Sequence, residues 1–172
     1  ENRAQENGRC VIVCQDKQGN VSDVLPTPFS HGSKVHEYGG IAYTVFDRCL
    51  YFVNAKDQRI YSIDLSKEGL SPSPVTPKNS LRYADLIFDS RHKRIIAICE
   101  DHSDARSIKN YIVSIQITGG LSEITTLISG SDFYAYPRLN SDNSDLCWIQ
   151  WNHPNMPWDH TCLLYTSDAA DD

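Results

Sequence analysis

Three groups of polar residues in the sequence carry side chains that could bind a ligand. The first is the segment 36–40, in which His36, Glu37 and Tyr38 precede two glycines. Two glycines allow a tight entry into a following strand, and this turn could present the three side chains to a ligand. Alternatively, His36 and Glu37 bond to the backbone of an ordinary turn. A zinc-protease motif is excluded because Gly40 stands where its second histidine would be.

The second group lies in residues 151–159, which contain two tryptophans and two prolines. This composition predicts a rigid aromatic loop. Asn152, His153 and Trp158 of this loop could form a binding surface. The loop could equally fill the space between neighbouring strands, and the sequence leaves both interpretations open.

Arg82 and residues 100–102 form the third group. Arg82 could bind a carboxylate through two parallel hydrogen bonds. It could instead pair with Asp85 or Glu100 and tie neighbouring repeats together. The tripeptide Glu-Asp-His at 100–102 could line a pocket or ligate a cation, and a solvated loop explains it as well. The candidate ligand-facing residues are thus His36, Glu37, Tyr38, Arg82, Asn152, His153 and Trp158.

No catalytic residue is predicted in the sequence. The nucleophile motif Gly-x-Ser-x-Gly fails at residues 69–73 and again at 120–124, because the last glycine is missing from both. Neither a P-loop nor a dinucleotide-binding glycine motif occurs. The 6 cysteines include no Cys-x-x-Cys pair, so no zinc site is predicted. We therefore expect neither a cofactor nor a metal.

The cysteines and the charge balance indicate a cytoplasmic protein. Cys10, Cys14, Cys49, Cys99 and Cys147 lie in apolar, strand-like contexts, which favours buried free thiols over disulfides. Lys+Arg number 16 and Asp+Glu 22, which gives a net charge of −6 and argues against a nucleic-acid partner. The longest apolar runs have only the length of a strand, so no membrane partner is expected.

The elements that must position these groups are β-strands. Short segments rich in β-branched and aromatic residues alternate with turns rich in Asp, Asn and Ser, whereas helical periodicity is nearly absent. Strands are predicted at residues 9–14, 21–25, 41–46, 50–54, 59–64, 84–89, 94–100, 111–117, 123–128, 134–139 and 146–151.

The predicted strands repeat as a unit of a hairpin, a third strand and a variable edge strand. One copy occupies residues 41–77, a second occupies 84–129, and a third begins at 134. A period of about 40–50 residues with four strands is typical of propeller blades, although a β-sandwich also fits. We expect an all-β fold: a partial β-propeller with four-stranded antiparallel blades, about two complete and two partial. Residues 1–161 form this partial propeller.

Several distinctive segments of the sequence occur together, in the same order, in one known family. They are Lys-Val-His-Glu-Tyr-Gly-Gly at 34–40, Tyr-Phe-Val-Asn at 51–54, Asp-Gln-Arg-Ile-Tyr at 57–61, Leu-Arg-Tyr-Ala-Asp at 81–85, residues 95–102, 129–134 and 137–139, and the loop 151–159. They resemble the N-terminal propeller of prolyl-oligopeptidase-family serine peptidases, in particular the acylaminoacyl-peptidase and dipeptidyl-aminopeptidase-like branch. Ser-Asp-Asn at 141–143 replaces the family's Pro-Asp-Gly turn, and Asn tolerates the same backbone geometry as Gly.

The resemblance implies a two-domain enzyme. In such an enzyme, the propeller caps a C-terminal α/β-hydrolase domain with a Ser-Asp-His triad, restricts access to short peptides and contributes substrate-facing loops. That domain is expected beyond Asp172, so this chain alone is expected to be catalytically silent. Its expected partners are the hydrolase domain of the same parent chain and a short peptide, with Glu37 as a candidate contact. The alternative is a free-standing propeller scaffold for protein partners.

The resemblance ends near Thr161. Residues 162–172 do not continue the expected strand and look like a read-through or frameshifted tail. We expect this tail to lie outside the fold.

Overall fold

The structure is a computed structural model that describes residues 1–67 and 69–167, and it is built almost entirely from β-strands. Its described residues include one short 3₁₀ helix, η1 (Ala4–Glu6), and no α-helix. Nothing in the described ranges is a helix of the length and apolar character that crossing a bilayer needs. The strands are β1 (Asn2–Arg3), β2 (Arg9–Cys10), β3 (Val13–Gln15), β4 (Val21–Asp23), β5 (Tyr43–Phe46), β6 (Cys49–Val53), β7 (Ile60–Asp64), β8 (Ser73–Pro74), β9 (Leu81–Asp89), β10 (Arg94–Asp101), β11 (Lys109–Gln116), β12 (Ile124–Ile128), β13 (Phe133–Leu139), β14 (Asp145–Trp151) and β15 (Cys162–Ser167).

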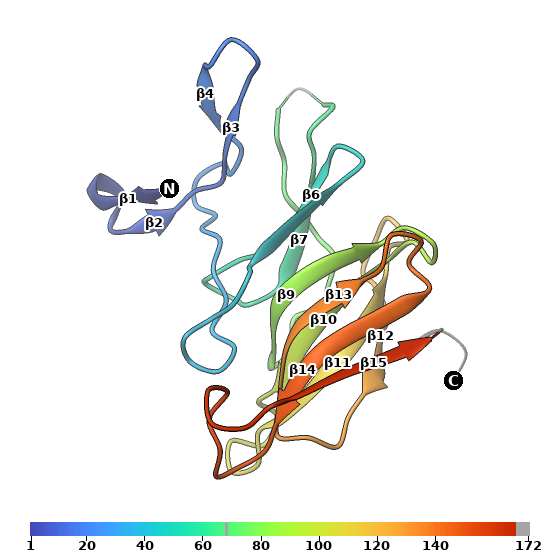
Figure 1. Ribbon diagram of the computed structural model, residues 1–172. Coiled ribbons are helices and arrows are strands. Elements are labelled where there is room, and N and C mark those ends of the chain that lie inside the picture. Colours follow the sequence, from blue (N-terminus) through green and yellow to red (C-terminus); the bar gives the residue numbers. More distant parts are fainter. Residues whose placement is uncertain (68, 168–172) are drawn as a thin grey trace.

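Two four-stranded antiparallel sheets form the centre of the molecule (Figure 1). Their strand orders are β5-β6-β7-β8 and β12-β11-β10-β9, so each sheet is a meander of consecutive strands. A third sheet contains β13, β14 and β15, while β1-β2 and β3-β4 are two-stranded. Four-stranded meanders stacked face to face are propeller blades. The predicted partial propeller is therefore confirmed, with two complete blades and partial ones beside them.

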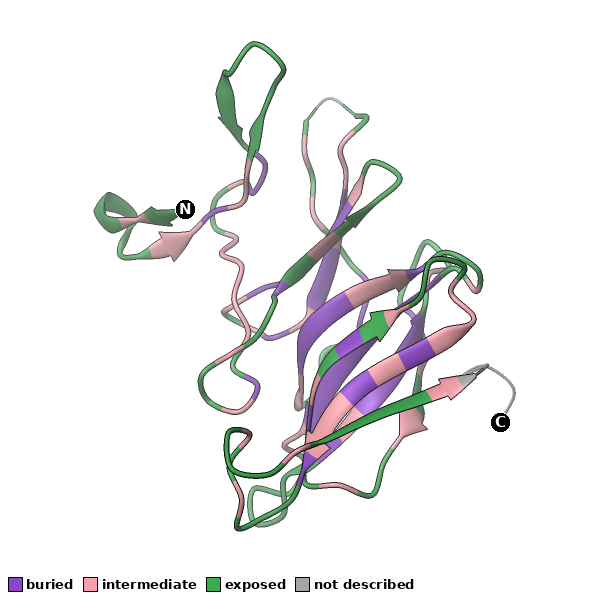
Figure 2. Cartoon of the chain, in the orientation of Figure 1, coloured by how far each residue is buried: buried purple, intermediate pink, exposed green. Residues whose placement is uncertain are grey.

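Strand β10 shows how one blade packs between two others. Residues 94–100 are all buried. Because successive side chains point to opposite faces of a strand, Ile95 and Cys99 pack toward the blade β5–β8, whereas Ile96 and Ile98 pack toward β13 and β14. An uninterrupted apolar run is the pattern of a strand that is covered on both faces. Figure 2 shows the resulting band of buried residues through the middle of the molecule.

Each meander places two kinds of connection at opposite ends of its blade. The turns that join β5 to β6, β9 to β10 and β13 to β14 lie at one end, which we call the hairpin end. The segments that enter β5, β9 and β13, together with the β10–β11 and β14–β15 connections, lie at the other end, which we call the loop end. The predicted turns at 47–48, 89–93 and 140–145 all lie at the hairpin end. There Asn143 adopts the left-handed region, with a φ of 59°, as expected for a residue in the place of glycine.

Two expectations, one about a strand and one about the cysteines, are wrong. Residues 9–14 do not form one strand, because β2 ends at Cys10 and β3 begins at Val13, and the two belong to different sheets. All six cysteines are free, and free thiols were predicted for five of them. The predicted burial is wrong for four of these five: Cys14 is exposed, and Cys10, Cys49 and Cys147 are partly exposed. Among the six, Cys99 alone is fully buried.

Residues 162–167 belong to the fold, contrary to expectation. They form β15, which pairs with β14 over a register running from Asp145↔Ser167 to Gln150↔Cys162. The loop after Trp151 therefore ends in the third strand of the blade, and the segment Cys-Leu-Leu-Tyr-Thr-Ser has the composition of an extended strand. The read-through origin of 162–172 stays a prediction, and residues 168–172 lie outside the described ranges.

Candidate functional site

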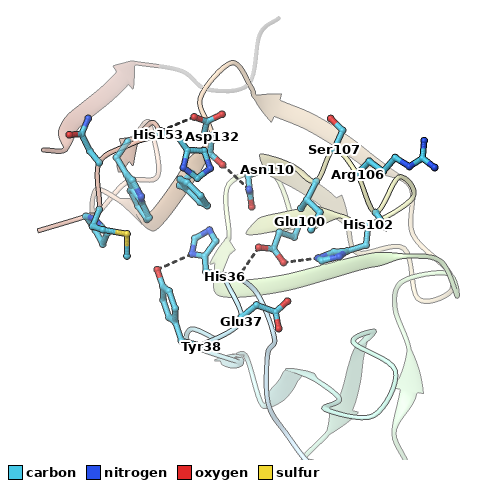
Figure 3. A pocket seen from close by; sticks show the side chains of 17 residues that line it. His36, Glu37, Tyr38, Glu100, His102, Arg106, Ser107, Asn110, Asp132 and His153 are labelled. Atoms are coloured by element: carbon cyan, nitrogen blue, oxygen red, sulfur yellow. Dashed lines mark hydrogen bonds and ion pairs between the residues drawn. The ribbon is translucent and has the colours of Figure 1, made fainter. Parts of the chain in front are cut away.

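Two adjoining cavities open at the loop end, where three blades meet, and Figure 3 shows the residues that line the first of them. The first has a volume of about 530 Å³ and is lined by the segment that enters β5, the β10–β11 connection and the β14–β15 loop. The second has a volume of about 310 Å³ and lies against the inner strands β9 and β13. His36, Tyr38, Trp151, Met156 and Pro157 line both cavities. Both volumes lie in the range of small-ligand sites, about 300–1,000 Å³.

Aromatic rings form one wall of the first cavity. Phe133 stacks on Trp151 with ring centroids 5.3 Å apart, and these residues are direct cross-strand partners in β13 and β14. His36 meets the two rings edge-on at 5.4 Å and 5.6 Å, and His153 packs against Phe133 at 4.9 Å. Since strand register sets the stack, the wall is a preformed apolar surface on which a ligand can pack.

Glu100 is the buried acid of the first cavity. Its side chain is 6% exposed, and Oε2 lies 2.8 Å from Nε2 of His102. The backbone N–H of His36 donates to Oε1 at 2.7 Å, and the guanidinium of Arg82 lies 3.8 Å from Oε2. Glu100 thus ties β10 to the entry of the neighbouring blade while its charge stays beside the cavity (Figure 3). Of the two interpretations of residues 100–102, the structure favours the pocket over the solvated loop.

Arg82 lines neither cavity and contacts the segment that enters β5. Its Nη1 donates to Oε1 of Glu37 at 2.6 Å and to the carbonyl oxygen of Lys34 at 3.0 Å. Arg82 therefore ties two blades together, as one interpretation of the sequence expects, but its nearest acid is Glu37 and not Asp85 or Glu100. The hydrogen bond and the charge of Arg82 lower the pKa of the exposed Glu37 carboxyl. Glu37 is consequently a charged group at the rim.

The turn that carries His36 and Glu37 is tightly bent. Both residues have a positive φ, 54° and 63°. This left-handed backbone conformation costs roughly 1–2 kcal/mol for each residue that is not glycine. Burial lowers the pKa of His36, although the charges of Glu100 and Asp85 and the amide of Asn110 oppose this effect. The neutral imidazole is therefore favoured at the cavity wall.

Asp85 lines the second cavity and joins β9 to β13 and to the segment that enters β5. The N–H of Ile41 donates to Oδ1 at 2.9 Å, and the N–H of Tyr136 donates to Oδ2 at 3.0 Å. Asp85 and Tyr136 stand at irregularities of β9 and β13 and have φ values of 53° and 54°. A Cβ atom at Gly40 would lie 2.8 Å from Oδ1 of Asp85. Because glycine has no Cβ atom, Gly40 lets the carboxylate of Asp85 lie close to the backbone of this turn.

The structure brings most of the predicted site residues together. The first cavity is lined by His36, Glu37, Tyr38 and His153, and the second by His36, Tyr38 and Trp158. Arg82 and Asn152 line neither cavity; Asn152 instead accepts a hydrogen bond from the N–H of Asp132 at 2.7 Å. Whether these residues contact a substrate stays a prediction. In the described ranges, no group of three or more His, Cys, Asp and Glu side chains is arranged to hold a metal ion.

The sequence analysis names Asp85 and Glu100 only as partners of Arg82 or, for Glu100, as part of a polar tripeptide, and it includes neither among the candidate ligand-facing residues. A signal exists for Asp85, because the repeats read Ile-Ala-Tyr at 41–43, Tyr-Ala-Asp at 83–85 and Tyr-Ala-Tyr at 134–136. An acid thus stands where the other copies have tyrosine. For Glu100 the polar tripeptide 100–102 is a local signal, but its contact with the N–H of His36 joins segments 64 residues apart and has no signal in the neighbouring sequence.

Comparison with solved structures places the chain beside two peptidases. A puromycin-hydrolyzing peptidase of Mycobacterium tuberculosis matches with a TM-score of 0.86 and 31% identity, over 97% of this chain and 28% of that protein. A puromycin hydrolase matches with a TM-score of 0.87 and 24% identity, over 96% of this chain and 28% of that protein. TolB from Acinetobacter baumannii, with a TM-score of 0.57 and 12% identity, shares the fold alone.

No protein-family model matches the sequence, and no curated protein matches it significantly. The structural neighbours are puromycin-hydrolyzing peptidases of the prolyl-oligopeptidase family, so the resemblance to a propeller of this family is confirmed. The chain spans 28% of the length of each of these two neighbours.

Proposed function

We propose that this chain is the non-catalytic propeller portion of a prolyl-oligopeptidase-like serine peptidase, and that its loop end holds short peptides for a hydrolase domain of the same parent chain. The observation that carries the proposal is the cavity of about 530 Å³ at the loop end, in a chain whose fold matches a puromycin-hydrolyzing peptidase. In this proposal, the propeller gates access and the hydrolase domain supplies the catalytic Ser-Asp-His triad.

The first cavity has the features that a short peptide requires. The ring wall of Phe133 and Trp151 can take an apolar side chain, while the few polar groups around it fix orientation. Binding a whole folded protein would instead need roughly 800 Å² of surface per partner. The concave loop end thus favours short peptides and amides such as puromycin over the free-standing scaffold.

We do not expect this chain alone to hydrolyse peptides. Ser107 and His102 both line the first cavity, but the imidazole of His102 contacts Glu100. Across the described ranges, no serine hydroxyl is hydrogen-bonded to a histidine nitrogen. A serine nucleophile needs an adjacent base, so the proposal assigns the cleavage step to the hydrolase domain.

The test is calorimetric binding of short peptides and of puromycin to the 172-residue chain. Ser107→Trp fills the first cavity from its exposed rim, and Ser103→Trp places the same side chain on the same connection outside the cavity. We expect binding to the wild type and to Ser103→Trp, loss of binding with Ser107→Trp, and no turnover of any ligand. Absence of binding to the wild type, or turnover blocked by a serine-directed inhibitor, would contradict the proposal.

Two finer points belong to the same proposal. The parent enzyme is proposed to act on acylated or dipeptidyl substrates, which peptidase assays with both chromogenic classes would separate. A cytoplasmic location is proposed because all six cysteines are free, as is usual in reducing compartments. Fractionation of cells followed by detection of the protein tests this point.

A further inference from the structure

Met156 is the single methionine of the chain, and it lies where the two cavities adjoin, since it lines both of them. It is 42% exposed, so a small solute reaches its side chain from solvent. A thioether is unbranched and polarizable and packs well against aromatic rings, and Trp151 belongs to the same shared wall. A chemical change at this one sulfur atom would therefore alter both cavities.

The backbone of the β14–β15 loop holds Met156 at this wall. Its N–H donates to Oδ2 of Asp159 at 3.0 Å, and its carbonyl oxygen accepts from the N–H groups of Asp159 and His160 at 3.0 Å and 3.4 Å. The bonds between Met156 and Asp159 close a turn around the two residues between them. A modified side chain at position 156 would therefore remain beside the cavities.

The cysteines are the rival targets of an oxidant. All six lie in the described ranges, and none of them lines either cavity. Cys99 is buried, and burial raises the pKa of its thiol to about 12, which disfavours the reactive thiolate. Cys14 and Cys162 are exposed, but they lie on β3 and β15. Oxidation of a thiol thus leaves the cavity walls as they are, whereas oxidation of Met156 changes them.

We propose that Met156 is a redox-sensitive modification site, at which oxidation to the sulfoxide by a hydroperoxide weakens binding at the loop end. The O–O bond of hydrogen peroxide breaks and an S–O bond forms, so that sulfur loses an electron pair and the peroxide is reduced to water. A methionine sulfoxide reductase reverses the change, because its thiols supply two electrons and two protons and the oxygen leaves as water. The inference rests on the proposed function, because it names a regulation of the same peptide site.

The sulfoxide should oppose binding because it places a polar oxygen on an apolar wall. In the first cavity, Met156 lines the same space as the stacked rings of Phe133 and Trp151, where an apolar side chain of the peptide is proposed to pack. A ligand ring that covers the new S–O group removes it from water without supplying a hydrogen-bond donor. We therefore expect the affinity for a short peptide to fall about fivefold or more.

The test is calorimetric binding of N-acetyl-Ala-Phe-Ala amide, a neutral peptide, to the full 172-residue chain before and after treatment with hydrogen peroxide. Mass spectrometry of the digested chain should find one added oxygen atom at Met156. The affinity should fall by the expected factor and return after treatment with a methionine sulfoxide reductase and a thiol reductant. Absence of the added oxygen, or complete oxidation of Met156 with unchanged affinity, overturns the inference.

Two variants assign the effect to the sulfur atom of Met156. Met156→Leu carries an apolar side chain that peroxide does not oxidise, so the affinity of this variant should be the same before and after treatment. Cys162→Ser removes an exposed thiol and should retain the response of the wild type. A response that persists in Met156→Leu, or that disappears in Cys162→Ser, overturns the inference. If a variant does not fold, reversal by the reductase in the wild type decides, because this enzyme acts on methionine sulfoxide and not on oxidised cysteine or tryptophan.

A second probe, 2-phenylethanol, separates the two proposals, and its binding is followed by ligand-observed NMR. If the peptide does not bind the untreated wild type while 2-phenylethanol binds and loses affinity on oxidation, the proposed function alone is refuted. If the peptide binds and its affinity ignores oxidation of Met156, this inference alone is refuted. If neither probe binds, both proposals are refuted.

Discussion

The buried acids at the two ends of the blades differ in their surroundings. At the hairpin end, Asp89 accepts hydrogen bonds from the backbone N–H groups of Arg91 and His92 and from the side chains of His92 and Arg94. At the loop end, Asp85 and Glu100 face cavities. A polar group whose partners lie in its own turn and the adjoining strand, as those of Asp89 do, stabilises that turn. One that faces an open space can be completed by a ligand.

Asp89→Ala should give the largest loss of stability, at the hairpin end. It leaves Arg94, whose side chain is 7% exposed, without its acid, and breaking a buried ion pair costs about 3–5 kcal/mol. Urea unfolding measures the change, and Asp142→Ala in the exposed β13–β14 turn is the control, expected within about 0.5 kcal/mol. Equal losses in both variants would show that the hairpin end does not depend on Asp89.

Gly40→Ala should give the next largest effect, at the loop end. The added Cβ would lie 2.8 Å from Oδ1 of Asp85 and 3.0 Å from Cβ of Ala84, and overpacking of this kind costs about 1–3 kcal/mol. Binding of short peptides at the loop end should weaken as well, because Gly40 lines the second cavity, and this separates the variant from Asp89→Ala. Gly120→Ala, where the added Cβ meets nothing within 4 Å, should change neither property.

His36 and Asp89 should make the two ends sensitive to acid in different pH ranges. Burial lowers the pKa of His36 below its ordinary 6.5, so the folded chain binds this proton less readily than the unfolded chain. The stability associated with His36 is present above pH 6.5 and is lost as the pH falls through 6.5 toward the lowered value.

For Asp89, burial opposes ionisation, but the hydrogen bonds from Arg94 and His92 outweigh it and lower the pKa below 3.8. Its contribution is therefore lost only below pH 3.8. Urea unfolding between about pH 7.5 and 5.5 should show a slope that His36→Gln reduces and that Asp89→Asn leaves unchanged. An identical slope in His36→Gln, with the exposed His160→Gln as reference, would contradict this assignment.

Asn143→Gly should have the smallest effect. The substitution keeps the left-handed turn at φ 59° easy to form and removes the contacts of the exposed Asn143 amide with the backbone N–H and Oγ of Ser90, at 3.1 and 2.7 Å, and with the carbonyl oxygen of Asn140 at 3.2 Å. The expected loss is about 1 kcal/mol or less. A loss as large as that of Asp89→Ala would mean that cross-blade contacts, and not the buried acid, hold the hairpin end together.

The hairpin end was more predictable from sequence than the loop end. Turns such as 140–145 depend on neighbouring residues, and the Ser-Asp-Asn sequence carries its own backbone preference. The contact of Glu100 with the N–H of His36, in contrast, joins segments 64 residues apart. Strand β15 was missed for a similar reason, because its role is set by pairing with β14 across the 152–161 loop.

The carboxylate of Asp85 gives two remote backbone amides, those of Ile41 and Tyr136, a common acceptor group. Neither amide can exchange its hydrogen with solvent unless that contact opens, and opening it loosens the inner strands of neighbouring blades. In native-state hydrogen exchange the two amides should therefore respond together, as members of one cooperative unit. This joint response is expected although the two amides belong to different blades.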